Sequence, residues 1–120
     1  MFNPLDIVHI KSINGKYEAV TILERHINLD DTITYITTWN CNKEYKEEDL
    51  ILVKRGCWRE KVFKIEFYPG DRVSWIDGRY LHVDTIVKKI YSYETSRALY
   101  KMSCGITIRK SHLRLCEGGI

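Results

Sequence analysis

Residues 67–75 read FYPGDRVSW and residues 2–10 read FNPLDIVHI, with Phe, Pro, Asp and Val at the same internal spacing. Such self-similarity predicts that one structural unit occurs twice in the chain. The alternative is a single β domain in which similar short strands and Gly-aromatic turns coincide. Three later landmarks recur in the same order: Gly15-Lys16-Tyr17 matches Gly78-Arg79-Tyr80, Tyr35 matches Tyr100, and DLIL at 49–52 matches HLRL at 112–115.

Both copies are rich in β-branched and aromatic residues, and turn signals interrupt them at short intervals, which predicts an all-β fold. Asn14-Gly15 and Asp77-Gly78 are typical of tight turns, because glycine adopts positive φ without strain. Alternation places Val73 and Trp75 on one face of their strand. Strands are expected at 6–11, 17–25, 32–39 and 50–53 in the first copy, and at 72–76, 80–90, 97–103, 107–110 and 113–115 in the second.

The 120 residues suffice for two very small units. We expect the first unit at 1–56, a connector at 57–66 and the second unit at 67–120. Units of this size avoid exposed sheet edges by closing into a small barrel. Because the connector carries Val62, Phe63 and Ile65 and little Gly/Ser/Pro linker chemistry, the two copies are expected to pack together.

The second copy, PGDRVSWIDGRYLHVDTI at 69–86 followed by LYKMSCGITIRKSHLRL at 99–115, resembles the Tudor family of SH3-like barrels. The Gly-Asp opening strand, the Trp before an Asp-Gly turn and the Tyr just after it carry this resemblance. The paired arrangement is similar to that of tandem Tudor or Agenet proteins. The resemblance implies two tandem SH3-like, Tudor-type small barrels packed together.

In Tudor domains, aromatic rings form a cage for methylated Lys or Arg, since ring faces attract a cation from which water is excluded. By resemblance, Trp75, Tyr80 and Tyr100 occupy three cage positions, whereas Ser-Cys-Gly-Ile at 103–106 replaces the fourth aromatic. The first copy matches more loosely and lacks the leading Trp. An alternative role for such rings is to fill a small barrel core. The expected aromatic groove comprises Trp75, Tyr80, Tyr100, Tyr17, Tyr35 and Trp39.

Charge is unevenly distributed along the chain. Residues 1–60 contain 8 Lys+Arg and 10 Asp+Glu, whereas residues 61–120 contain 11 and 6. A basic second copy with interleaved tyrosines favours contact with nucleic acid as an alternative to a protein partner. The alternative interpretation is a solvent-exposed basic face that only keeps the protein soluble. The candidate nucleic-acid residues are Lys88, Lys89, Lys101, Arg109 and Lys110.

No motif in the sequence indicates an enzyme, a metal site or a cofactor. Phosphate loops, dinucleotide fingerprints and calcium-binding loops are absent from the sequence. His82 and Asp84 share a strand face without further catalytic groups, and Cys104, His112 and Cys116 lack the close pairs of zinc sites. With no apolar run of roughly 18 residues and no signal-peptide pattern, we expect no membrane contact and an intracellular protein, cytoplasmic or nuclear, with reduced cysteines.

The sequence therefore predicts a non-enzymatic binding or adaptor module that recognises a protein segment through aromatic grooves, with methylated Lys or Arg as one candidate ligand. One alternative is a nucleic-acid-binding protein that uses the basic second barrel. Another is a viral accessory protein that binds and blocks a host factor.

Overall fold

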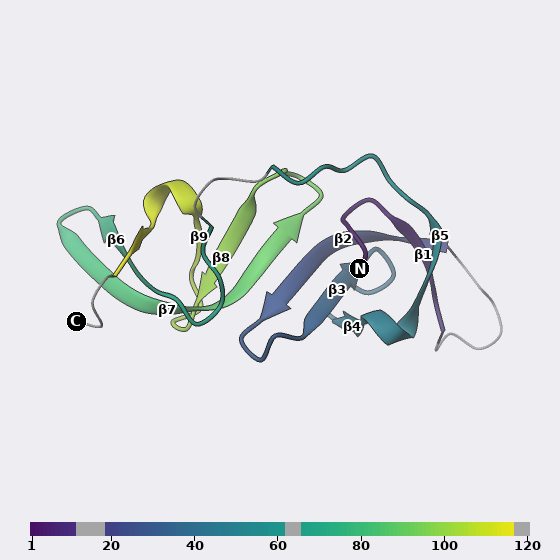
Figure 1. The fold of residues 1–120 in the computed structure, drawn as a ribbon, viewed down its shortest axis with the longest axis horizontal. Coiled ribbons are helices and arrows are strands. Elements are labelled where there is room, and N and C mark those ends of the chain that lie inside the picture. Colours follow the sequence, from purple (N-terminus) through teal and green to yellow (C-terminus); the bar gives the residue numbers. More distant parts are fainter. Residues whose placement is uncertain (12–18, 62–65, 117–120) are drawn as a thin grey trace.

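The computed structural model describes residues 1–11, 19–61 and 66–116, which form ten strands and two 3-10 turns (Figure 1). The all-β prediction is confirmed, and each expected strand overlaps an observed one. Strand β4 and the two 3-10 turns were not predicted. The first half contains β1 (Ile7–Ile10), β2 (Ala19–Asn28), β3 (Ile33–Thr37), β4 (Tyr45–Lys46), η1 (Glu47–Asp49) and β5 (Leu50–Lys54). The second half contains β6 (Arg72–Asp77), β7 (Tyr80–Ser92), β8 (Ala98–Met102), β9 (Thr107–Arg109), η2 (Lys110–His112) and β10 (Arg114–Leu115).

The two halves have the same strand pairing, all of it antiparallel. In the first half β1 lies between β5 and β2, and β3 and β4 follow on the other side of β2. In the second half β6 lies between β10 and β7, followed by β8 and β9. Among the described residues β4 does not pair with β5, nor β9 with β10, so neither sheet closes in the way a complete barrel requires.

The repeated Phe-x-Pro-x-Asp-x-Val pattern has a structural cause in each half. Phe2 packs edge-on against Tyr35 with ring centroids 5.4 Å apart, and Phe67 does the same against Tyr100 at 5.7 Å. The Asp side chain accepts a hydrogen bond from the backbone N–H three residues earlier, over 2.9 Å in both copies. This side-chain bond stabilises the turn that leads into the first strand. The repeated motif therefore fixes the entrance to each sheet.

Leu5 and Gly70 precede the two Asp residues and both have positive φ, 70° and 98°. Glycine tolerates this conformation, whereas leucine adopts it at a cost. The Leu5 side chain packs against the core of the second half, which offsets that cost and ties the two halves together. Gly78, with φ of 62°, forms the predicted turn between β6 and β7. The other predicted turn, Asn14-Gly15, lies outside the described residues.

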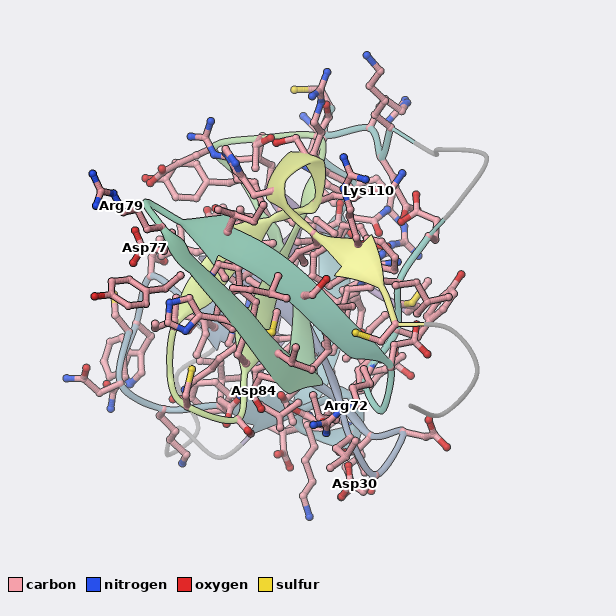
Figure 2. All side chains as sticks on the ribbon, turned by 90° about the vertical axis from the view of Figure 1, so that its left-hand side faces the viewer. Asp30, Arg72, Asp77, Arg79, Asp84 and Lys110 are labelled. Atoms are coloured by element: carbon pink, nitrogen blue, oxygen red, sulfur yellow. The ribbon has the colours of Figure 1, made fainter. Side chains whose placement is uncertain are left out.

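The halves are joined by an antiparallel ladder between β2 and β7, in which Glu24 pairs with Ser92 and Asn28 with Lys88. Each half keeps its own core, one around Val8, Ile22 and Tyr35 and the other around Val73, Ile86 and Tyr100. The result is an elongated molecule of 53 × 25 × 24 Å, with the segment after β5 running over to the second half (Figure 1). Figure 2 views it from the end formed by β6, β7 and β10.

Candidate functional site

The structure divides the predicted groove aromatics between core and surface. Tyr35 and Tyr100 are completely buried, and Trp75 is 8% exposed in the second core, where it stacks on His82. Tyr80 is exposed at the β6–β7 hairpin, and Trp39 is exposed in the other half. Tyr17 lies outside the described residues. The five described aromatics therefore do not line one open groove, because the buried rings serve packing.

An aromatic cage does exist, but a residue of the chain itself occupies it. The ammonium of Lys89 lies 4.3 Å from the ring centroid of Tyr68, 5.3 Å from that of Tyr91 and 5.8 Å from that of Tyr100. It also donates a hydrogen bond to Glu66 over 3.1 Å, and its side chain is 1% exposed. Ring faces and a carboxylate thus compensate a buried cation. Burial, followed by the charge of Glu66, raises the pKa of Tyr100 well above its usual range.

The predicted nucleic-acid residues occupy four different environments. Lys89 is buried as described, which removes it from any ligand surface. Lys88 donates a hydrogen bond to Glu44 over 2.6 Å. Lys101 is half-buried on β8, beside β9. Arg109 and Lys110, in contrast, line a cavity.

That cavity, the basic cavity from here on, has a volume of about 780 Å³ and lies between the β7–β8 turn and η2. Among the described residues, three cationic side chains, Arg97, Arg109 and Lys110, contribute to its wall, and Glu94 is the one carboxylate. Hydroxyl groups and apolar side chains complete the lining. They are Ser92, Thr95 and Ser111, and Phe67, Ala98, Leu99 and Leu113.

Neighbouring groups hold both walls of the basic cavity in place. The indole N–H of Trp58 donates to the carbonyls of Ser92 and Thr95, at 3.1 and 2.9 Å, and the N–H of Lys61 donates to Ser96 O at 2.8 Å. On the other side, Leu113 follows η2 and is buried in the second core. The connector thus fixes the β7–β8 turn, and the core fixes η2. Such fixed walls favour binding, because few side chains and loops have to become ordered when a ligand enters and the entropy cost is small.

The sequence indicated the basic residues here but not the hydroxyls. Thr95 and Ser111 carry no signal in the sequence, since nothing in a linear pattern places 92–98 beside 109–113. The repeat offered one signal: η1 and η2 occupy equivalent places, yet Glu47 begins the first and Lys110 the second. Because of this charge difference between matched positions, an anion is less repelled at η2 than at η1.

A network of ionisable groups links β2 and β7, which pair in the central ladder, with Glu44 in the loop before β4. Both ring nitrogens of His26 lie within hydrogen-bond distance of a carboxylate, Glu24 at 2.7 Å and Glu44 at 2.8 Å. Burial tends to raise the pKa of Glu44, but hydrogen bonds from Lys88, His26 and Thr34 outweigh it and lower the pKa from 4.5 to about 2. The ionised carboxylate is therefore the form that the fold favours.

Replacing Glu44 with glutamine is expected to reduce the sensitivity of the protein to acid. Because the Glu44 pKa is lowered on folding, its stabilising contribution is complete above about 4.5 and is lost as pH falls toward about 2. The wild-type protein should therefore be more stable than Glu44→Gln at neutral pH, with the difference shrinking through this window. Urea unfolding of both proteins across that pH range measures this difference in the free energy of unfolding. Parallel curves for the two proteins would contradict this role of Glu44.

His82 and Asp84, which share a strand face, contact different partners. His82 stacks on Trp75, whereas Asp84 accepts hydrogen bonds from the Ser103 hydroxyl and, at 3.0 Å, from the Cys104 N–H. The Ser103 bond is the main reason that the pKa of Asp84 falls to about 2. Asp84 therefore stabilises the β8–β9 turn.

Among the described residues, no group of three or more His, Cys, Asp or Glu side chains is arranged to hold a metal ion. The same part of the chain contains no helix with the length and apolar character needed to cross a membrane. Comparison with protein-family models, curated proteins and solved structures found no match to this chain.

Proposed function

We propose that this protein is a non-enzymatic binding module of two SH3-like, Tudor-type units, and that the second unit binds single-stranded nucleic acid in the basic cavity. The observation that carries the proposal is the convergence of Arg97, Arg109 and Lys110 on one cavity beside hydroxyl donors. The repeated arrangement of five antiparallel strands around a separate core supports the assignment of two small barrel-type units.

The lining of the basic cavity suits a nucleotide. Arginine and lysine neutralise a phosphate, and hydroxyl groups donate further hydrogen bonds to its oxygens. The apolar lining residues, such as Leu99 and Phe67, offer a surface for a base. A single strand fits this arrangement better than a duplex, because its bases are free to leave the stack.

The nucleic-acid hypothesis takes precedence over the aromatic-groove hypothesis for a geometric reason. Recognition of methylated lysine needs open ring faces, and the rings of Tyr91 and Tyr100 already surround Lys89. Tyr80 and Trp39 are exposed but belong to different halves. Binding of a protein segment through aromatic residues stays a prediction.

The single variants Arg109→Gln and Lys110→Gln are each expected to weaken binding of a fluorescent oligothymidylate several-fold. Each lost phosphate contact should also make the negative slope of log Kobs against log salt concentration shallower by about 0.7. Replacing Arg97, Arg109 and Lys110 together should make it shallower by about 2. Fluorescence anisotropy over a salt series measures both quantities. Arg79→Gln is the matched control, because it removes the same charge at the tip of the β6–β7 hairpin. Arg79 lies at a distance from Lys110 there (Figure 2).

Absence of binding at low salt would refute the proposal. An equal loss of affinity in Arg79→Gln and Arg109→Gln would show attraction by overall charge rather than a site.

A further inference from the structure

The strand β5 forms an open edge of the sheet. It pairs with β1 on one side, and no backbone hydrogen bond joins the other side of residues 51–54 to the described chain. The Asp49 carbonyl accepts a hydrogen bond from the Lys11 N–H, on the β1 side. Because backbone groups alternate in direction along a strand, those of Leu52 face the open side, as does the Leu50 carbonyl. Figure 1 shows β5 at the end of the molecule remote from the β6–β7 hairpin.

This open edge is apolar and exposed. Ile51, Leu52 and Val53 are 43%, 38% and 48% exposed. Edge strands are commonly protected by charges or proline within the strand, whereas β5 carries no proline and a single charge, Lys54, at its end. A register shift opposite Ile7 interrupts the regular ladder only near Lys54. Residues 50–53 are therefore suited to pair with a further strand.

The charges on either side of β5 indicate that the partner strand is β5 of a second copy of the chain. Residues 47–55 read EEDLILVKR, so three acidic residues precede the apolar segment and two basic residues follow it. Two copies of this segment in antiparallel orientation place the acidic end of each beside the basic end of the other. Glu48 and Lys54 are both exposed, and neither forms an ion pair within the described residues.

One antiparallel register pairs the opposite charges and also forms one backbone hydrogen bond from each copy to the other. If the two-fold axis passes through Ile51, Leu52 of each copy lies opposite Leu50 of the other. The Leu52 N–H then donates to the Leu50 carbonyl, while the Leu50 N–H remains bonded to Glu47 within its own chain. The same register brings Lys54 of each copy toward Glu48 of the other. Opposite charges across paired strands stabilise the pairing, and like charges oppose it.

We propose that this protein forms a homodimer by antiparallel pairing of two β5 strands around Ile51. The contact joins the two sheets through the Leu52 N–H to Leu50 carbonyl bond of each copy and covers the apolar edge. A single short strand pair buries little area, so the dimer is weak and its population depends on protein concentration.

Charge exchange provides the test. Wild-type protein should show a reversible monomer–dimer equilibrium by sedimentation velocity between micromolar and millimolar concentration. Lys54→Glu and Glu48→Lys should each raise the dimer dissociation constant by about tenfold or more, because each variant sets two like-charge pairs across the axis. An equimolar mixture of the two variants should dimerise again, since every facing pair is then of opposite charge. The double variant Glu48→Lys/Lys54→Glu should likewise recover.

Circular dichroism and urea unfolding verify that each variant is folded, and Lys43→Glu is the control for charge reversal away from β5. A wild-type monomer at every concentration overturns the proposal. A dimer whose dissociation constant is the same in Lys54→Glu and in the control also overturns it. Since no oligonucleotide is present in these experiments, their result is independent of the proposed nucleic-acid binding.

Discussion

Replacing Tyr100 with alanine is expected to lower the free energy of unfolding by about 3–5 kcal/mol, the range for truncation of a fully buried aromatic ring. Tyr100 has no exposed surface, packs edge-on against Phe67 and donates a hydrogen bond to Glu66 over 3.3 Å. Its loss also removes one ring face from the buried ammonium of Lys89. Because small domains have only about 5–15 kcal/mol in total, the variant should be close to unfolding. Urea denaturation followed by tryptophan fluorescence measures the loss.

Tyr80→Ala is the matched control, since Tyr80 was placed in the same predicted groove but is 73% exposed. A change within about 0.5 kcal/mol is expected there. If Tyr100→Ala is as stable as the wild-type protein and loses only a ligand, then the ring belongs to a binding groove and its assignment to the core is wrong.

The substitution Asp6→Ala is expected to cost about 3 kcal/mol, and Asp71→Ala, at the equivalent position of the second half, about 1 kcal/mol. The Asp6 carboxylate is 2% exposed and accepts hydrogen bonds from Asn3 N at 2.9 Å, from Arg55 Nη1 at 2.8 Å and from Gly56 N at 2.8 Å. Removing it leaves the N–H groups of Asn3 and Gly56 without this acceptor, whereas Arg55 keeps its hydrogen bond to the Met1 carbonyl. Asp71 accepts the side-chain bond from Tyr68 N, at 2.9 Å, which is the repeated part of the arrangement.

The difference between the two Asp variants isolates the contribution of Arg55 and Gly56, which follow β5. Gly56 approaches so closely that a Cβ atom there would lie 2.3 Å from the Leu5 carbonyl oxygen, and this approach lets its N–H reach Asp6. Unfolding in urea, compared at equal pH, provides both values. Equal losses for Asp6→Ala and Asp71→Ala would mean that the contacts of Arg55 and Gly56 add nothing to stability.

Much of the fold was predictable because its signals are local. Asp77-Gly78 specifies a tight turn by backbone preference alone, and alternation buries Val73 and Trp75 together. The short strand β4 was missed because Tyr45 and Lys46 lie in a polar segment with no alternation to detect. Closure of the sheets was expected from unit size, but strand number does not determine whether the last strands pair.

The candidate site was less predictable, because its features depend on contacts between distant residues. An inward-facing aromatic on a strand serves a core or a cage equally well, and the sequence around Tyr100 does not distinguish the two. Burial of Lys89 follows from its place opposite Tyr100 in the β7–β8 ladder and from Glu66 nearby. The matched position in the first half, Arg25 opposite Tyr35, is also a buried cation, so the repeat contained a signal that composition did not reveal.

An NMR titration of isotope-labelled protein with oligothymidylate tests most directly whether the basic cavity binds nucleic acid. The backbone amide signals of residues 92–98 and 107–113 should shift progressively with added oligonucleotide, while those around Trp39 and Ile76 remain in place. Shifts confined to the surroundings of Trp39 or Tyr80, or no shift at low salt, would contradict binding in the basic cavity.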